Sequence, residues 1–283
     1  MPDNERMVAE TLPVNGIELC VESFGEPADP ALLLIAGCGR SMDWWEDEFC
    51  RRLAAGGRHV IRYDHRDTGR STSFPAGDPP YSGVDLAHDA LGVLDALGVH
   101  KAHLVGLSMG GGLGMRIAVE RPHRVLSLTL MSATPGEDAD PPEAVPVPYT
   151  DWSSRRASVN RLIAGAIELG GPFTAEEPHL RRLAERVFDR TYDMTASQTN
   201  HVRCAGAPSL RARLGSITAP TLILHGTLDR VFPAGHAQAL TAEIPGARLV
   251  WLDGVGHEFP PMAVWSQVIE EIIGQSARGR QPA

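Results

Sequence analysis

Residues 105–110 read V-G-L-S-M-G, and this short stretch decides which fold the rest of the chain is expected to adopt. The serine, Ser108, has a glycine two residues before it and another two residues after it. An apolar β-rich run, Ala102–Leu107, ends directly before Ser108, and an apolar helical run, Met109–Glu120, begins directly after it. A serine in a strained strand-to-helix turn needs neighbours without a Cβ, and the helix N-terminus favours developing negative charge. The stretch predicts a nucleophile at Ser108; the alternative is a glycine-rich turn without catalysis.

Short β-rich runs alternate with longer amphipathic runs on both sides of this stretch. The further elements that we expect are strands at 16–25, 31–37, 59–63, 125–131, 221–225 and 248–252, and helices at 43–56, 86–97, 234–242 and 262–273. Strands that alternate with helices of about 10–15 residues are typical of βαβ units. The pattern therefore predicts an α/β fold with a mainly parallel sheet and helices on both faces.

The alternation stops between residues 134 and 216. Five prolines within 135–150 predict a loop or linker there. The runs 155–170 and 180–190 have helical periodicity, and neither has a strand-like run beside it. The simplest interpretation is a helical lid, or cap, inserted above an α/β core; the alternative is a small separate domain. We therefore expect one core made of residues 1–133 and 217–283, interrupted by an insertion at 134–216.

Two later segments supply the base and the acid that a serine nucleophile requires. Asp229 follows one buried strand-like run, and His257 lies in the loop after the next. Because sites in open α/β sheets form at the carboxyl ends of strands, we expect both residues on the same edge as Ser108. Asp253 stands only four residues before His257, which is too close to reach under its ring. His225, at a strand end, is favoured as a packed histidine rather than the base.

Composition excludes several other classes of protein. The net charge of −9, from 26 basic and 35 acidic residues, argues against a nucleic-acid binder. Apolar runs such as Ala31–Ala36 are far shorter than the roughly 20 residues of a membrane span, and residues 1–6 do not resemble a signal peptide. The cysteines form no CxxC pair and the histidines no HExxH motif. We therefore expect reduced thiols, a cytoplasmic location, and neither a metal nor a cofactor.

Four segments carry a resemblance to a known family: 31–45, 49–57, 60–72 (VIRYDHRDTGRST) and 105–110. They resemble serine α/β-hydrolases of the aclacinomycin-methylesterase-like branch, whose members hydrolyse the methyl ester on a polyketide aglycone. The resemblance implies an α/β-hydrolase fold outside the insertion, with the nucleophile, acid and base in that chain order. The insertion shows no matching motif, so the substrate is not carried over with the fold.

The oxyanion hole of such an enzyme needs two backbone N–H donors. One is expected from Met109, directly after the nucleophile, and the match to the family places the second at Cys38. Many relatives have His-Gly before this position, where this chain has Ala36-Gly37; a backbone donor is unaffected by that change. The chain has no HGGG run, which argues against bulky tertiary-alcohol esters. Cys38 as the nucleophile is a weaker alternative, because no neighbour visibly lowers its pKa.

The resemblance also implies structural roles for Asp64 and Asp67, which are expected to hold their turn together with Arg66 and Arg70. Aromatic residues and methionines near the first loop and in the insertion are candidates for a substrate pocket. The alternative for each of them is packing of the lid or of a helix against the core. The predicted pocket residues are Met42, Trp44, Trp152, Phe173, Phe188, Tyr192 and Met194.

Together these patterns predict a serine-dependent carboxylic-ester hydrolase that acts on a small-molecule ester. A methylesterase of a polyketide or other specialised metabolite is the narrower expectation, and it rests on the resemblance alone. One alternative is another enzyme with the same three residues: a lactonase, a C–C bond hydrolase or a cofactor-free perhydrolase. An alternative of another class is a receptor-like protein that only binds a ligand. Neither a nucleic acid nor a membrane is expected as a partner, and the oligomeric state is not predicted.

Overall fold

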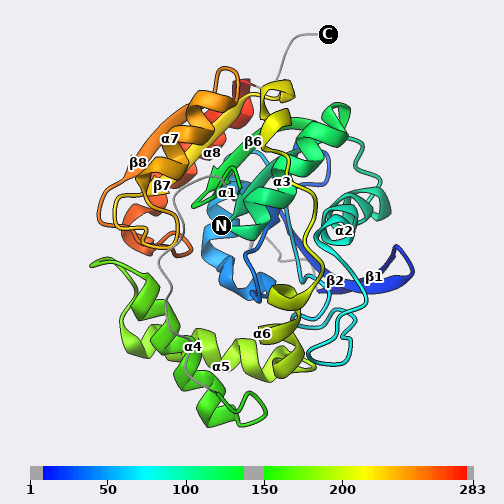
Figure 1. Ribbon diagram of the computed structural model, residues 1–283, viewed down its shortest axis with the longest axis vertical. Coiled ribbons are helices and arrows are strands. Elements are labelled where there is room, and N and C mark those ends of the chain that lie inside the picture. The colour runs from blue at the N-terminus through cyan, green and yellow to red at the C-terminus, as the bar shows by residue number, and fades with distance from the viewer. Residues whose placement is uncertain (1–8, 137–149, 279–283) are drawn as a thin grey trace.

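The fold is seen in a computed structural model that describes residues 9–136 and 150–278. The predicted linker at 135–150 lies almost entirely outside these residues. One eight-stranded sheet, in the order β1-β2-β4-β3-β5-β6-β7-β8, runs through the molecule (Figure 1). Its strands are β1 (Glu10–Val14), β2 (Ile17–Phe24), β3 (Ala31–Ile35), β4 (His59–Tyr63), β5 (Ala102–Leu107), β6 (Val125–Met131), β7 (Thr221–Gly226) and β8 (Arg248–Leu252). Strand β2 pairs antiparallel with β1 and β4, and the other pairs are parallel, so the predicted mainly parallel sheet is confirmed.

The helices follow the strands along the chain as expected. They are α1 (Asp47–Ala55), α2 (Gly83–Ala96), α3 (Met109–Glu120), α4 (Arg155–Leu169), α5 (Glu177–Arg190), α6 (Met194–Arg203), α7 (Ala234–Glu243) and α8 (Trp265–Arg278). The helix expected at 43–56 is interrupted, because a short 3-10 turn at Met42–Trp44 precedes α1. None of the helices within the described ranges is long and apolar enough to cross a membrane.

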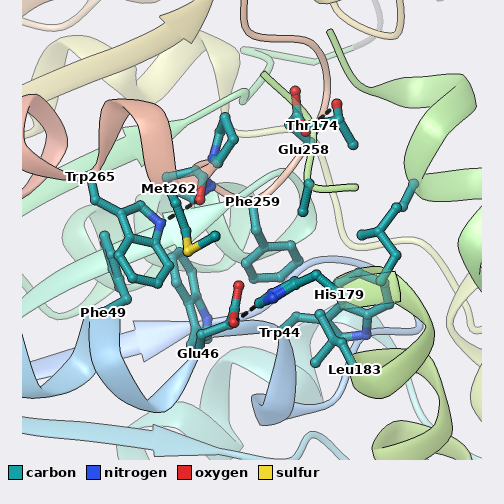
Figure 2. A pocket seen from close by; sticks show the side chains of 16 residues that line it. Trp44, Glu46, Phe49, Thr174, His179, Leu183, Glu258, Phe259, Met262 and Trp265 are labelled. Carbon is teal, nitrogen blue, oxygen red and sulfur yellow. Dashed lines mark hydrogen bonds and ion pairs between the residues drawn. The ribbon is translucent and has the colours of Figure 1, made fainter. Parts of the chain in front are cut away.

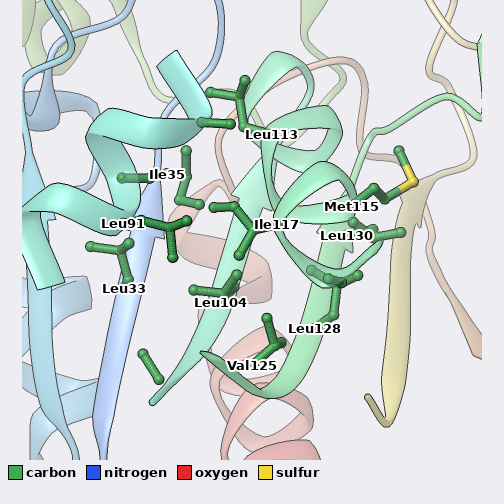
Figure 3. Packing of buried hydrophobic residues seen from close by; sticks show 14 of the residues in the cluster. Leu33, Ile35, Leu91, Leu104, Leu113, Met115, Ile117, Val125, Leu128 and Leu130 are labelled. Atoms are coloured by element: carbon green, nitrogen blue, oxygen red, sulfur yellow. The ribbon is translucent and has the colours of Figure 1, made fainter. Parts of the chain in front are cut away.

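The alternating side chains of β3 show how the sheet is covered on both faces. Leu33 and Ile35 pack with residues of α2, α3 and α7 in one buried cluster, part of which Figure 3 shows. Leu32 and Leu34 point the other way and pack with residues of α1 and α8. Successive residues of a strand point to opposite faces, so a strand that is apolar throughout must be covered on both. The predicted helices on both faces of the sheet are therefore present.

Three of the helices, α4, α5 and α6, lie between β6 and β7 in the sequence and gather at one end of the molecule (Figure 1). They have a small apolar cluster of their own, in which Val159 and Leu162 of α4 pack with Leu180 and Ala184 of α5. Trp44, from the loop region after β3, joins this cluster. The insertion is thus packed directly on the loop that follows β3.

The turn at Ser108 leaves no room for side chains at its two glycines. Ser108 itself has φ +53°, which is uncommon for a residue with a Cβ. A Cβ at Gly106 would lie 2.2 Å from the carbonyl oxygen of Gly110, and a Cβ at Gly110 would lie 2.2 Å from that of Ile35. Only glycine fits at either position, so these two residues allow β5, the serine and the start of α3 to pack against the end of β3.

Because the turn is tight, replacing neighbouring glycines by alanine is expected to change the stability of the protein in opposite directions. Gly106→Ala or Gly110→Ala is expected to lower the free energy of unfolding by about 1–3 kcal/mol, because backbone atoms must move. Gly112 lies on the exposed side of α3 with no atom near its absent Cβ. Gly112→Ala is therefore expected to raise stability by about 0.5–1 kcal/mol through its helix propensity. Chemical denaturation of the three variants checks this, and equal effects would contradict the close packing of the turn.

The loop after β4 is held in place by hydrogen bonds and ion pairs of Asp64. Asp64 is buried and accepts hydrogen bonds from the backbone N–H groups of Met42 (2.9 Å) and Arg70 (3.0 Å). Its guanidinium partner is Arg190 of α5, which also pairs with Asp43. Arg66 and Arg70 were expected to hold this turn together with Asp64 and Asp67. Arg70 does so through its backbone N–H, whereas the Arg66 side chain pairs with α2.

Nearby, Arg66 pairs with Asp89 of α2 at 2.6 Å. Asp67 instead accepts hydrogen bonds from the hydroxyl of Tyr81 and from the side chain of Asn200 in α6. Asp67 has φ +67°, so its backbone is in the left-handed region as well. The turn is therefore held partly by helices of the insertion, which the local sequence does not reveal.

Arg190 ties the insertion to the core, and its loss is expected to be costly. Arg190→Met would leave Asp64 buried without its cation, while Asp43 keeps Arg186 at 2.8 Å, and is expected to lower the free energy of unfolding by about 3 kcal/mol. Arg155 is the matched control, because it also pairs with a carboxylate, Asp189, but on the exposed surface. Arg155→Met is expected to have a much smaller effect. Urea denaturation of both variants measures the difference, and similar losses would argue against a special role for the buried network.

Candidate active site

Three side chains meet at the carboxyl edge of the sheet. Ser108 follows β5, Asp229 follows β7, and His257 follows β8. The Ser108 Oγ lies 3.0 Å from Nε2 of His257, and Nδ1 of His257 lies 2.9 Å from Oδ2 of Asp229. The topology explains the meeting, because parallel strands β5, β6, β7 and β8 are consecutive in the sheet and end on one side.

The partners of His257 determine which of its nitrogens carries the proton. The pKa of Asp229 is below its ordinary value: burial raises it, but the hydrogen bond and charge of His257 and the N–H of Phe232 outweigh that effect. An ionised carboxylate only accepts hydrogen bonds, so Nδ1–H of His257 donates to Asp229. In the neutral ring this leaves Nε2 as the acceptor that faces the Ser108 hydroxyl. That tautomer is the one that can remove a proton from the serine.

The two rival residues are placed elsewhere. Asp253 is exposed and accepts a hydrogen bond from the hydroxyl of Thr227 (3.2 Å). His225 is buried, and its Nε2–H donates to the carbonyl oxygen of Phe232 at 2.7 Å. Burial lowers the pKa of His225, which keeps the ring neutral. Neither rival takes the position that Asp229 and His257 occupy beside Ser108.

The loop after β3 runs beside the serine. A Cβ on Gly37 would lie 3.6 Å from the Cβ of Ser108, so this loop is in contact distance of the serine. Met109 is the first residue of α3, where the backbone N–H has no partner within the helix. Cys38 lies in the loop itself, and its side chain borders the cavity described below. Surrounding protein raises the pKa of the Cys38 thiol to about 11, so it is protonated at neutral pH.

Helix α6 holds this loop from the side of the insertion. The backbone N–H of Gly39 donates to Nδ1 of His201 at 3.0 Å, and the side chain of Gln198 donates to the Gly39 carbonyl at 2.7 Å. Nε2 of His201 in turn bonds to the carbonyl of Arg66 at 2.9 Å. Sequence reasoning missed both α6 residues, because 162 positions separate Gly39 from His201.

A cavity of about 470 Å³ opens above Ser108 and His257. Trp44 and Trp152, both predicted pocket residues, line it. The other five lie outside its lining: Met42, Met194 and Phe188 are packed inward, while Phe173 and Tyr192 are exposed at the surface. Residue type alone did not show which way these side chains point. Within residues 9–136 and 150–278, no group of three or more His, Cys, Asp or Glu side chains is placed to hold a metal ion.

One face of α4 supplies much of the cavity wall. Its lining residues recur at the spacing of a helix face and are Arg161, Leu162, Gly165, Ala166, Glu168 and Leu169. This spacing is a signal that the sequence contained, although it does not say what the face covers. Arg40, Gln198, Val231 and Phe259 also line the cavity and were not predicted.

Glu258 links the histidine loop to the insertion. It accepts hydrogen bonds from the N–H of Gly171 (3.0 Å) and from the hydroxyl of Thr174 (2.8 Å), both just after α4. The backbone N–H of His257 donates to the carbonyl of Leu169 at 2.7 Å. Figure 2 shows Glu258 and Thr174 above a smaller pocket of about 60 Å³, in which Trp44 and Phe259 face each other. The end of α4 is therefore fixed to the loop that carries His257.

Comparison with known proteins places this geometry in a family. The family model described as the alpha/beta hydrolase fold matches residues 30–260. The rhodomycin D methylesterases DauP of Streptomyces sp. (strain C5) and DnrP of Streptomyces peucetius are 38% and 37% identical to the chain. Each match covers 86% of this chain and 90% of the relative.

A solved structure is similar over almost the whole chain. The enol-lactonase from Burkholderia xenovorans LB400 superposes with a TM-score of 0.76 at 25% identity, covering 95% of this chain and 100% of the other. The fold that the sequence predicts is thereby confirmed, and so is the resemblance on which that prediction partly rested. With its sheet, its strand-to-helix turn at Ser108 and a family match over most of its length, the chain belongs to the α/β hydrolase family.

Proposed function

We propose that this chain is a serine-dependent carboxylic-ester hydrolase in which Ser108 is the nucleophile, His257 the general base and Asp229 the residue that orients it. The observation that carries the proposal is the continuous hydrogen-bonded series from Ser108 Oγ through His257 to Asp229, at 3.0 and 2.9 Å. A hydroxyl is a weak nucleophile without such a base, and the base needs a third group to fix its tautomer.

The first half of the reaction forms an acyl-enzyme. His257 removes the hydroxyl proton as Ser108 Oγ attacks the ester carbonyl, giving a tetrahedral intermediate. The backbone N–H groups of Met109 and Cys38 hold the oxyanion. As the intermediate collapses, the C–O bond to the alcohol breaks and His257 gives its proton to the departing oxygen. Asp229 stabilises the imidazolium that exists between these steps.

Water completes the cycle. It enters the position vacated by the alcohol, His257 removes one of its protons, and the hydroxyl attacks the acyl carbon. The same two N–H groups hold the second oxyanion, and the proton returns to Ser108 as the acid leaves. Acyl transfer by this route uses only side chains and backbone of the chain itself.

The proposed substrate is the methyl ester of a polyketide or other specialised metabolite. The names of the two methylesterase relatives support a methyl ester, and the cavity wall, with Trp44, Trp152 and Phe259 beside aliphatic side chains, suits an aromatic framework. A cavity of about 470 Å³ is in the range of small-molecule sites. We propose residues 134–216 as the lid that closes this cavity over the core formed by 1–133 and 217–283.

A lactonase is the second candidate, because a lactone is an internal ester and the enol-lactonase has a similar fold. The same three residues would open it without a departing alcohol. A receptor that only binds its ligand is less well supported. Binding alone has no need for a histidine aligned between a serine and a buried carboxylate. Labelling of Ser108 by a fluorophosphonate separates the enzymes from a receptor.

Replacement of the serine tests the proposal directly. Ser108→Ala is expected to lower kcat for a p-nitrophenyl acyl ester by at least about 10⁴-fold with an unchanged melting temperature. Cys38→Ser is the control for the weaker alternative, because Cys38 is proposed to act through its backbone. That variant should keep activity within a few-fold of the wild type. Turnover that survives in Ser108→Ala, or disappears in Cys38→Ser, would contradict the assignment.

The same assay distinguishes Asp229 from Asp253 as the carboxylate that orients His257. Asp229→Asn is expected to lower kcat by about 10³–10⁴-fold, because an amide can stabilise the wrong tautomer of His257. Asp253→Asn changes an exposed residue outside the series and should leave kcat nearly unaffected. The KM values of both variants are expected to stay close to that of the wild type. A larger loss for Asp253→Asn than for Asp229→Asn would reverse the assignment.

A further inference from the structure

Arg40 has a charge that no acidic residue near it neutralises. It lines the catalytic cavity, two positions after the proposed oxyanion donor Cys38. Its Nη1 nitrogen is buried and has no hydrogen-bond partner among the described residues. Within residues 9–136 and 150–278 its guanidinium forms no ion pair either. Its one charge-related contact is with the ring of Trp44, whose centroid lies 4.5 Å from Cζ.

The surroundings of Arg40 destabilise its charged form relative to a guanidinium in water. Burial lowers the pKa of Arg40 to about 10; Cys38 acts in the opposite direction, and Arg161 lowers the pKa further. At neutral pH the guanidinium is still charged, and Cys38 is still a neutral thiol. Arg40 is only partly buried as a residue, but its Nη1 nitrogen is shielded from solvent without a partner, which costs free energy.

The other charged groups of the cavity are already satisfied. Arg161 pairs with Glu168 at 3.2 Å along α4. Glu258 accepts hydrogen bonds from Gly171 and Thr174, and burial raises its pKa. The free positive charge at the cavity wall is therefore that of Arg40. Arg40 and Ser108 line the same cavity, so a group bound at one can belong to a molecule that also reaches the other.

We propose that Arg40 binds an anionic oxygen of the substrate, a carboxylate or an ionised phenol on the same aromatic framework as the ester. This inference rests on the proposed ester hydrolysis and narrows its substrate class. A guanidinium pairs with an anionic oxygen through charge-assisted hydrogen bonds, which are about twice as strong as neutral ones. The ester carbonyl then sits at Ser108 while the acidic group meets Arg40.

Matched substrates test this pairing. The monomethyl esters of terephthalic acid, a naphthalene dicarboxylic acid and a biphenyl dicarboxylic acid vary the distance between the ester and the carboxylate. For each, the analogue with a carboxamide in place of the carboxylate is the neutral control. On at least one framework, the wild type is expected to hydrolyse the acid with a kcat/KM about tenfold above that of the amide, a difference of about 1.4 kcal/mol.

Two substitutions assign the preference to Arg40. Arg40→Gln is expected to reduce the acid-to-amide ratio to about one, while hydrolysis of the amide stays within about threefold of the wild type. Arg40→Lys should keep part of the ratio, because the charge remains. Arg155→Gln, which changes an exposed arginine outside the cavity, should leave the ratio unchanged. The melting temperature of Arg40→Gln should change little, because the charge that is removed has no acidic partner among the described residues and its Nη1 makes no hydrogen bond.

Several outcomes would overturn the inference. They are a ratio near one on all three frameworks in the wild type, an equal loss for acid and amide in Arg40→Gln, or a large fall in the melting temperature of that variant. An equal loss for acid and amide would mean that Arg40 stabilises the oxyanion rather than binding an anionic group of the substrate. A large fall in the melting temperature would mean that its role is structural. Failure of the wild type to hydrolyse even neutral p-nitrophenyl esters would instead contradict the proposed function, so the two failures are distinguishable.

Discussion

The close approach of two glycines to neighbouring backbone is the constraint on which the site depends. Gly110 allows the start of α3 to lie against the carbonyl oxygens at the end of β3, and Gly106 allows α3 to turn back over β5. This contact sets the position of Ser108 at φ +53°. It also brings the loop after β3 beside the serine, so the nucleophile and the second proposed oxyanion donor are positioned by one packing contact rather than by two.

The segment between β6 and β7 does more than line the cavity. Helix α6 holds Gly39 through His201, and the end of α4 accepts the backbone N–H of His257. Arg190 of α5 reaches the buried Asp64 beneath the same loop. These polar contacts are buried, so leaving any of them unmade costs more than a surface contact would. The helices that shape the substrate cavity therefore also fix the two loops between which the reaction is proposed to occur, and changes in one affect the other.

Local sequence predicts those parts of the molecule that local physics determines. The strands β4, β5, β6 and β8 and helix α3 begin and end where the periodicity places them, because each is a short apolar element bounded by turn residues. Strand β1 was missed, since Pro13 weakens the pattern and is tolerated only because the strand lies at the sheet edge. Helix α6 was missed because its polar residues face partners far away in the sequence, as His201 faces Gly39.

The chain order and strand ends were enough to select Ser108, Asp229 and His257 from their rivals, but not to describe the cavity. Five of seven aromatic or methionine candidates point elsewhere, because hydrophobicity favours packing and pocket equally. The arginines near the core differ in whether they have an acidic partner. Arg62 pairs with Glu22, Arg66 with Asp89 and Arg190 with Asp64, whereas Arg40 faces a cavity. Among residues 9–136 and 150–278, Arg40 has no acidic partner, so an anionic ligand in the cavity would supply the counter-charge that these three arginines find within the fold.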